Sequence, residues 1–258
     1  MVFTAAEFAD IMPDATQIES CEPEMESSLH YTQLMLLVAC LEWLWRDRND
    51  FFVGANLTVY FSRQQLKNRD FRGPDLFLVQ GCDRNPRKSW VVWEEDGKYP
   101  DLIIELLSDS TDRTDRNLKK TLYQDRFSTH EYFYFSPHTL EFEGFRLINK
   151  CYEPIALNDK QQRWSEELDL FLGIQDCKLR YFHPNGELVL SPQEDADRLA
   201  RSLQQTQRNL DQVQEWSQSQ VQQAQARETQ AQAREAQAQL QADRLREQLR
   251  ALGIAPDL

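Results

Sequence analysis

The sequence is poor in the residues that build small disulfide-bonded or zinc-stabilised proteins. Only five cysteines and four histidines occur among 258 residues, and no two cysteines form a CxxC pair. An odd number of cysteines without metal-ligand spacing argues against a disulfide framework and against a zinc site. Glycine is also scarce, with eight residues, which argues against a loop-rich or fibrous protein. We therefore expect a packed protein of the reducing cytoplasm.

Long hydrophobic runs are missing as well. The most apolar stretch, LMLLVACLEWLW at residues 34–45, contains Glu42 and is followed by Arg46. A helix needs about 20 apolar residues to cross a bilayer. The first residues reach Asp10 before any apolar region develops, so they do not resemble a secretory signal. We expect a cytoplasmic, soluble protein without a membrane partner.

Positive charge is in short supply. The formal net charge is −13. Residues 191–258 contain eight arginines and ten acidic residues, so the preceding 190 residues carry −11 of that total. Phosphate affinity comes mainly from Lys and Arg, so the acidic body argues against general nucleic-acid binding unless a cleft is locally basic.

The patterns that are present predict three regions. Residues 1–27 form an irregular arm, residues 28–190 a domain of strands and helices, and residues 191–258 a Gln/Ala/Arg-rich tail. Helices are expected from Ser28 and over about 114–127. Apolar runs predict strands at 55–62, 75–80, 89–95, 101–108 and 131–137, with shorter candidates at 140–148, 151–157, 179–184 and 187–190. The fold class is therefore α/β or α+β, a mixed sheet flanked by helices.

The tail has heptad character. Apolar residues and one threonine recur at steps of four and three at Leu199, Leu203, Thr206, Leu210 and Val213. Three seven-residue units follow at 223–243, in which alanine replaces leucine on the seam and buries less surface. We expect one long helix that forms a coiled coil only with a partner, such as a second copy of the chain. A single solvated helix or a partly disordered tail is the alternative.

The segment PDLIIELLSDSTDRTDRNLKK at residues 100–120 carries the strongest functional signal. Alternation in its strand places Asp101, Ile103 and Glu105 on one face, and a carboxylate is costly to bury unless it is paired or binds a metal. If the strand that begins near Asp75 runs antiparallel to this one, Asp75 meets Glu105. Asp101 would then lie about 13 Å away. Two carboxylates completed by waters suit Mg²⁺ or Mn²⁺.

The following helix supplies paired lysines, Lys119 and Lys120. Adjacent helical positions differ by about 100°, so only one of them can point back toward the acids. A lysine near such a cation can stabilise charge on a phosphate or position the attacking water.

GPDL at 73–76, YPDLIIELLSDST at 99–111, DRNLKKTLY at 115–123 and EYFYFSP at 131–137 together resemble the Uma-two family of the PD-(D/E)xK restriction-endonuclease-like superfamily. The resemblance covers about residues 28–190, and the tail resembles members with a C-terminal coiled coil. It implies a Mg²⁺- or Mn²⁺-dependent endonuclease that cleaves DNA and works as a dimer. Asp75 and Glu105 would bind the metal, and Lys119 would be the catalytic lysine. The superfamily pattern places that lysine two residues after the acid, where this chain has Leu107.

Several residues remain as secondary candidates. Glu26 and His30 lie at the start of the first helix, and such helices flank the metal site in this superfamily. Asp101 could be an outer site residue or simply the acid that opens its strand. Asp115 could orient Lys119 or pair with it at i,i+4, and Lys120 is the neighbouring lysine. The acidic body and Leu107 favour an alternative function, a weakly active or inactive endonuclease fold that acts as a binding or assembly module through its coiled coil.

Overall fold

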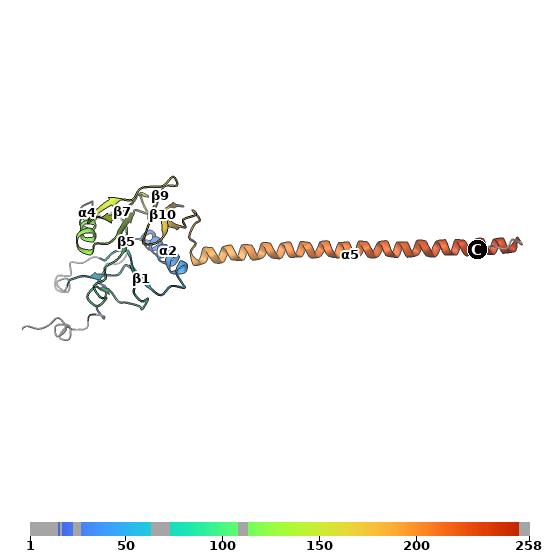
Figure 1. Cartoon of the computed structure of the whole chain (residues 1–258), viewed down its shortest axis with the longest axis horizontal. Coiled ribbons are helices and arrows are strands. Elements are labelled where there is room, and N and C mark those ends of the chain that lie inside the picture. Colours follow the sequence, from blue (N-terminus) through green and yellow to red (C-terminus); the bar gives the residue numbers. More distant parts are fainter. Residues whose placement is uncertain (1–14, 16, 23–26, 63–72, 108–112, 253–258) are drawn as a thin grey trace, which may run out of the picture. The chain divides into compact units, whose positions relative to one another are not determined.

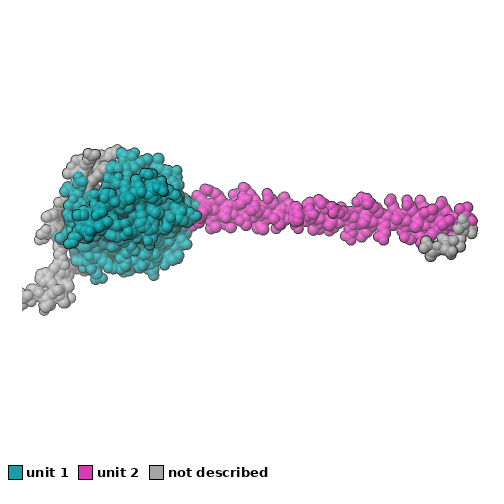
Figure 2. All heavy atoms as spheres, turned by 45° about the horizontal axis from the view of Figure 1, so that its top comes forward, with its two compact units in different colours: residues 1–194 teal, residues 195–258 magenta. Residues whose placement is uncertain are grey.

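The computed structural model describes residues 15, 17–22, 27–62, 73–107 and 113–252. The chain divides into two compact units, residues 1–194 and residues 195–258 (Figure 2). All the strands belong to the first unit, and the second unit is built on helix α5 (Pro192–Ala251), which begins in the first.

The first unit begins its regular structure with helix α2 (Ser28–Leu44), and Ser27 caps it by accepting a hydrogen bond from the His30 N–H. The elements that follow are β1 (Phe51–Ala55), β2 (Val59–Tyr60), β3 (Leu76–Gln80), β4 (Trp90–Val91), β5 (Leu102–Leu106), α4 (Arg113–Leu122), the π-helical turn η1 (Tyr123–Phe127), β6 (Glu131–Phe135), β7 (Phe142–Ile148), β8 (Cys151–Pro154), β9 (Gln162–Ser165), β10 (Leu170–Gln175) and β11 (Lys178–Phe182).

Six strands form a mixed sheet in the order β1-β3-β5-β6-β7-β8. β3 and β5 are antiparallel, with Leu76 opposite Ile104, whereas β5 and β6 are parallel. The parallel pair is connected through α4 and η1, as a parallel pair requires. Strands β9, β10 and β11 form a second sheet, and β2 and β4 a short parallel pair. The expected α/β mixed sheet with flanking helices is confirmed.

The two faces of the six-stranded sheet bury different layers. Leu102, Ile104 and Leu106 of β5 belong to a core shared with α2 and the three-stranded sheet. Ile103 lies in the opposite core with Tyr123 and other aromatic residues. In Figure 1, β5 lies between α2 and α4. Because side chains alternate along a strand, Glu105 falls on the Ile103 face, the face that carries α4 and η1.

Some strand expectations were wrong. The run at 55–62 yields only β2, while the preceding strand β1 starts at Phe51. Strands β9 and β10 were not expected, and β10 turns into β11 through Asp176 and Cys177, both at positive φ. The expected return strand at 187–190 is reduced to an isolated bridge between Phe182 and Leu188.

Helix α5 begins with a reciprocal cap. The Ser191 Oγ accepts from the Glu194 N–H at 3.3 Å, and Glu194 Oε2 accepts from the Ser191 N–H at 2.8 Å. Both terminal nitrogens of Arg180 in β11 donate hydrogen bonds to the same carboxylate, at 2.9 and 2.7 Å. α5 has no buried residue. Within the described ranges, no helix is both long and apolar enough to span a membrane.

Candidate active site

Two acids from neighbouring strands meet at one end of β3 and β5. The register pairs Leu76 with Ile104, so the next pair places Asp75 opposite Glu105. Asp75 is fixed there because its Oδ2 accepts a hydrogen bond from the Leu106 N–H at 2.7 Å. The Glu105 side chain is 3% exposed and that of Asp75 is 21% exposed. The pair thus has a buried member and a member that solvent reaches.

Two donors from one side of α4 and η1 reach Glu105. Lys119 Nζ lies 2.7 Å from Oε2, and the Tyr123 hydroxyl donates to Oε1 at 2.6 Å. The residues are four apart, so helical geometry places them on the same face. Lys119 is 20% exposed, whereas Tyr123 is completely buried. Each oxygen of the Glu105 carboxylate therefore has its own donor.

The surroundings shift the pKa values of the two carboxyl groups in opposite directions. Burial raises the pKa of Glu105 to about 7, against the attraction of Lys119 and with a further rise from the Asp75 charge. Burial alone would also raise the pKa of Asp75. The attraction of His30 and Lys119 and the Leu106 N–H outweigh it and lower that pKa below its usual value. Asp75 is thus the ionised acid at neutral pH, and Glu105 is poised between its two states.

His30 of α2 lies close to the pair formed by Asp75 and Glu105. Its Nε2 atom lies 2.5 Å from the Leu106 carbonyl oxygen and 4.0 Å from Asp75 Oδ2. A carbonyl can only accept, so Nε2 carries a proton. The ring is buried and ties α2 to the end of β5, and its interaction with the Asp75 carboxylate helps to lower the pKa of that acid.

A third acid, Glu22, was not foreseen. Its Oε1 accepts from the Thr58 hydroxyl at 2.8 Å and from the Gly73 N–H. Burial raises its pKa, and the charges of Lys119 and Asp75 both act on it. A Cβ atom at Gly73 would come within 2.8 Å of Glu22 and 2.4 Å of the Leu57 carbonyl oxygen, so this close approach requires glycine. Residues 20–22 carry no periodic pattern, so only the fold reveals Glu22.

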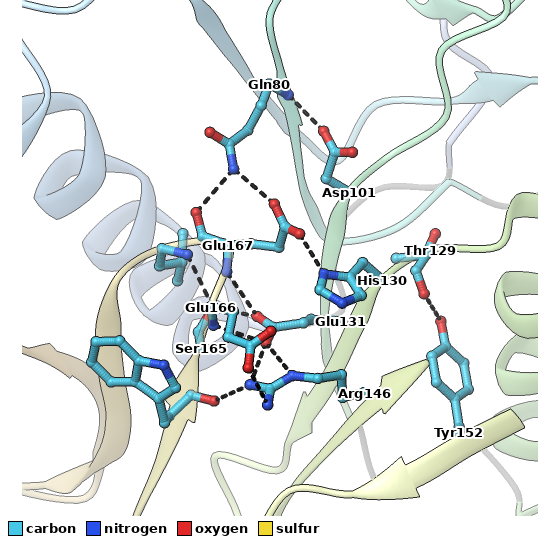
Figure 3. A network of polar contacts seen from close by, with 12 residues as sticks. Gln80, Asp101, Thr129, His130, Glu131, Arg146, Tyr152, Ser165, Glu166 and Glu167 are labelled. Atoms are coloured by element: carbon cyan, nitrogen blue, oxygen red, sulfur yellow. Dashed lines mark hydrogen bonds and ion pairs between the residues drawn. The ribbon is translucent and has the colours of Figure 1, made fainter. Parts of the chain in front are cut away.

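Asp101 lies at the far end of β5, in a different network (Figure 3). Its Oδ2 accepts from the Gln80 N–H at 2.7 Å. The Gln80 side chain donates to Glu167, and Glu167 contacts His130 at 2.5 Å. Asp101 therefore ties strand ends together away from Asp75 and Glu105, because four residues of strand separate it from Glu105.

The remaining candidates do not join the pair. Lys120 contacts a different residue, with Nζ 3.3 Å from the centre of the Phe145 ring. Asp115 lies in α4, but its side chain is outside the described part of the structure. Glu26 also lies outside the described residues. Of the residues expected from sequence, Asp75, Glu105, Lys119 and His30 come together.

The chemistry of this oxygen donor set fits a hard divalent cation. Among the described residues, no group of three His, Cys, Asp or Glu side chains could hold a metal ion together. Two carboxylates are nevertheless sufficient for Mg²⁺, which usually keeps several waters and takes one or two carboxylates plus substrate phosphates. A zinc site, which takes four protein ligands or three and a water, does not match.

Comparisons with known proteins identify the family of the chain. A family model, Uma2, described as "Putative restriction endonuclease", matches residues 14–180, more than half of the chain. The chain belongs to the Uma2 family. A solved structure, a "putative nuclease belonging to DUF820" from Anabaena variabilis ATCC 29413, is 15% identical with a TM-score of 0.45. The match covers 68% of this chain and 97% of that one. No curated protein matches.

In this Uma2 chain, the lysine that contacts Glu105 lies on helix α4. Leu107, two residues after Glu105, is buried, and its N–H donates to the Phe135 carbonyl at 2.7 Å. A lysine at that position would have to bury its ammonium group. Lys119 instead reaches Glu105 from α4 and keeps part of its side chain in solvent.

Proposed function

We propose that this protein is a metal-dependent endonuclease that hydrolyses phosphodiester bonds in DNA. The observation that carries the proposal is the convergence of Asp75, Glu105 and Lys119 from three separate elements. The Uma2 family supports the same reaction class. Mg²⁺ or Mn²⁺ would be held by Asp75 and Glu105.

Each residue has a defined task in this proposal. Asp75 is held ionised and faces solvent, so it is the first oxygen ligand. Glu105 completes the ligand pair when it is deprotonated. Lys119 supplies a compact positive charge beside the scissile phosphate. The bound cation would withdraw charge from the phosphate and make water a better nucleophile. Glu22 is a further acid whose ionisation is influenced by the charges of Lys119 and Asp75.

Plasmid cleavage with Mg²⁺ or Mn²⁺ tests the proposal. We expect the wild type to nick supercoiled DNA, and we expect chelator, Glu105→Ala and Lys119→Ala to reduce nicking by at least about 100-fold. Lys120→Ala is the matched control, because Lys120 has the same charge one position along α4 but faces Phe145. If Lys119→Ala and Lys120→Ala lose nicking activity equally, the role assigned to Lys119 is wrong. A wild type that cuts nothing across metals and substrates would overturn the nuclease proposal.

A second function, a binding or assembly module with little or no activity, is favoured by the −11 charge of the body. The exposed leucines and valines of α5 also favour it. We propose that a second copy of the chain pairs with this helix whichever function holds. Metal binding separates the two functions, since a module without catalysis needs no cation at Asp75 and Glu105.

A further inference from the structure

The buried hydroxyl of Tyr123 occupies an unusual place for a core tyrosine. It donates to Glu105 Oε1 at 2.6 Å, while Lys119 holds Oε2 at 2.7 Å. A carboxylate has about four lone-pair directions on its two oxygens. Two fixed donors therefore define the plane of the carboxylate and leave defined directions for a further ligand.

Two other aromatic rings pack against the ring of Tyr123. Its centroid lies 5.4 Å from that of Phe127 and 5.6 Å from that of Tyr132. Tyr123 begins the π-helical turn η1, and its carbonyl accepts from the N–H groups of Ser128 and Thr129 as that turn closes. π-helical turns inside helices are rare and are found frequently at functional sites. The packing of its ring thus holds the Tyr123 hydroxyl in place, and the backbone of β5 holds Glu105 in place.

We propose that Tyr123 is a positioning residue that orients the Glu105 carboxylate to bind a divalent cation together with Asp75. The inference rests on the proposed function and names a residue beyond its acids and lysine. The simpler reading is that the hydroxyl only satisfies a buried carboxylate and so contributes to stability. Cation affinity separates these readings, because a hydrogen bond that serves stability alone has no effect on affinity in the folded protein.

The test is Mn²⁺ binding to the purified full-length protein, measured by electron paramagnetic resonance without any nucleic acid. Tyr123→Phe removes only the hydroxyl. Loss of a partner that orients a metal ligand costs about 10- to 100-fold in affinity, so we expect the Mn²⁺ Kd to rise by that factor. Tyr152→Phe is the matched control, because the Tyr152 hydroxyl makes a 2.9 Å hydrogen bond to the Thr129 carbonyl and touches neither carboxylate. Its Kd should stay within about twofold of wild type.

The outcomes distinguish the inference from the function beneath it. If Tyr123→Phe binds Mn²⁺ as tightly as the wild type does, the positioning role is overturned and the nuclease proposal still stands. A wild type that binds no Mn²⁺ would overturn both. In the double variant Glu105→Gln/Tyr123→Phe, the second change should weaken binding no further, because Tyr123 acts through Glu105.

A wild-type measurement covers the case in which Tyr123→Phe does not fold. The proton of a buried hydroxyl that donates to a carboxylate exchanges slowly and can be followed by proton NMR. We expect its resonance to shift on titration with Mg²⁺, and we expect no such shift in Glu105→Gln. The proposal would be contradicted if the chemical shift of the Tyr123 hydroxyl proton stayed the same at Mg²⁺ concentrations that saturate the wild type.

Discussion

The carboxyl group of Glu105 links the candidate site to the stability of the fold. Its pKa is raised from 4.5 to about 7, first of all by burial. A folded protein that holds a proton more tightly than the unfolded chain is most stable below the unfolded pKa. That stabilisation is lost as the pH rises through the folded pKa. Without metal, we therefore expect the free energy of unfolding to fall between about pH 5 and pH 8, by on the order of 3 kcal/mol.

Denaturant unfolding across this pH range checks the expectation. Glu105→Gln cannot titrate, so its stability should lack that part of the slope. Lys120→Ala should keep the slope. Parallel slopes in the wild type and in Glu105→Gln would show that another group titrates.

At the residue scale, the acids were predictable and their supports were not. Asp75 and Glu105 could be paired because alternation along a strand is a local signal and because an antiparallel register was assumed. Tyr123 lies four residues after Lys119, a spacing that indicates a shared helix face, yet nothing in the sequence shows which face meets the sheet. Glu22 precedes a proline in an aperiodic segment, so its place depends entirely on the long-range contact with Thr58 and Gly73.

At the scale of elements, the start of α5 depends on a charge pair. The pKa of Glu194 is lowered from 4.5 to about 2, chiefly by its hydrogen bonds with Arg180. A lowered folded pKa stabilises the protein above the unfolded pKa, and this contribution is lost as the pH falls toward 2. We expect Glu194→Gln to lower the Tm at pH 7 and to match the wild type near pH 2. Thermal unfolding at both pH values checks this, with Glu215→Gln on the exposed part of α5 as the control. A Tm difference that persists at pH 2 would contradict it.

Elements with a strong period were predicted better than elements defined by turns. The leucine spacing of α2 and the apolar run of β5 each carry their own signal over several residues. The β10–β11 hairpin uses Asp176 and Cys177 at positive φ, where Asn-Gly or Asp-Gly would have been the recognisable pair. The Asn185-Gly186 pair does form a turn, with Gly186 at φ +88, but only one bridge follows it.

At the scale of the whole molecule, α5 leaves its apolar residues without cover. Leu203 is 62% exposed and Leu210 is 52% exposed. Exposed apolar seams of this kind mark interaction sites. We expect the wild type to sediment as a concentration-dependent dimer. Leu203→Asp with Leu210→Asp should shift it to monomer by at least about tenfold in Kd, because each buried leucine contributes about 2 kcal/mol.

The matched control places two new negative charges off the seam, as Gln204→Asp with Gln212→Asp. It should leave the dimer intact. A wild type that remains monomeric at high concentration would contradict the pairing of α5 with a second copy of the chain.

Residues 1–27 precede helix α2 (Ser28–Leu44), so they are an obvious target for truncation before expression. Ser20 and Cys21 are hydrogen-bonded to Thr58, and Glu22 reaches both Thr58 and Gly73. A truncation that starts at Ser28 would delete a carboxylate whose charge acts on Asp75 and would loosen the β2–β4 pair. Affinity tags therefore belong ahead of Ala15. Failure of such a shortened protein to cut DNA would therefore not by itself count against the proposed nuclease function.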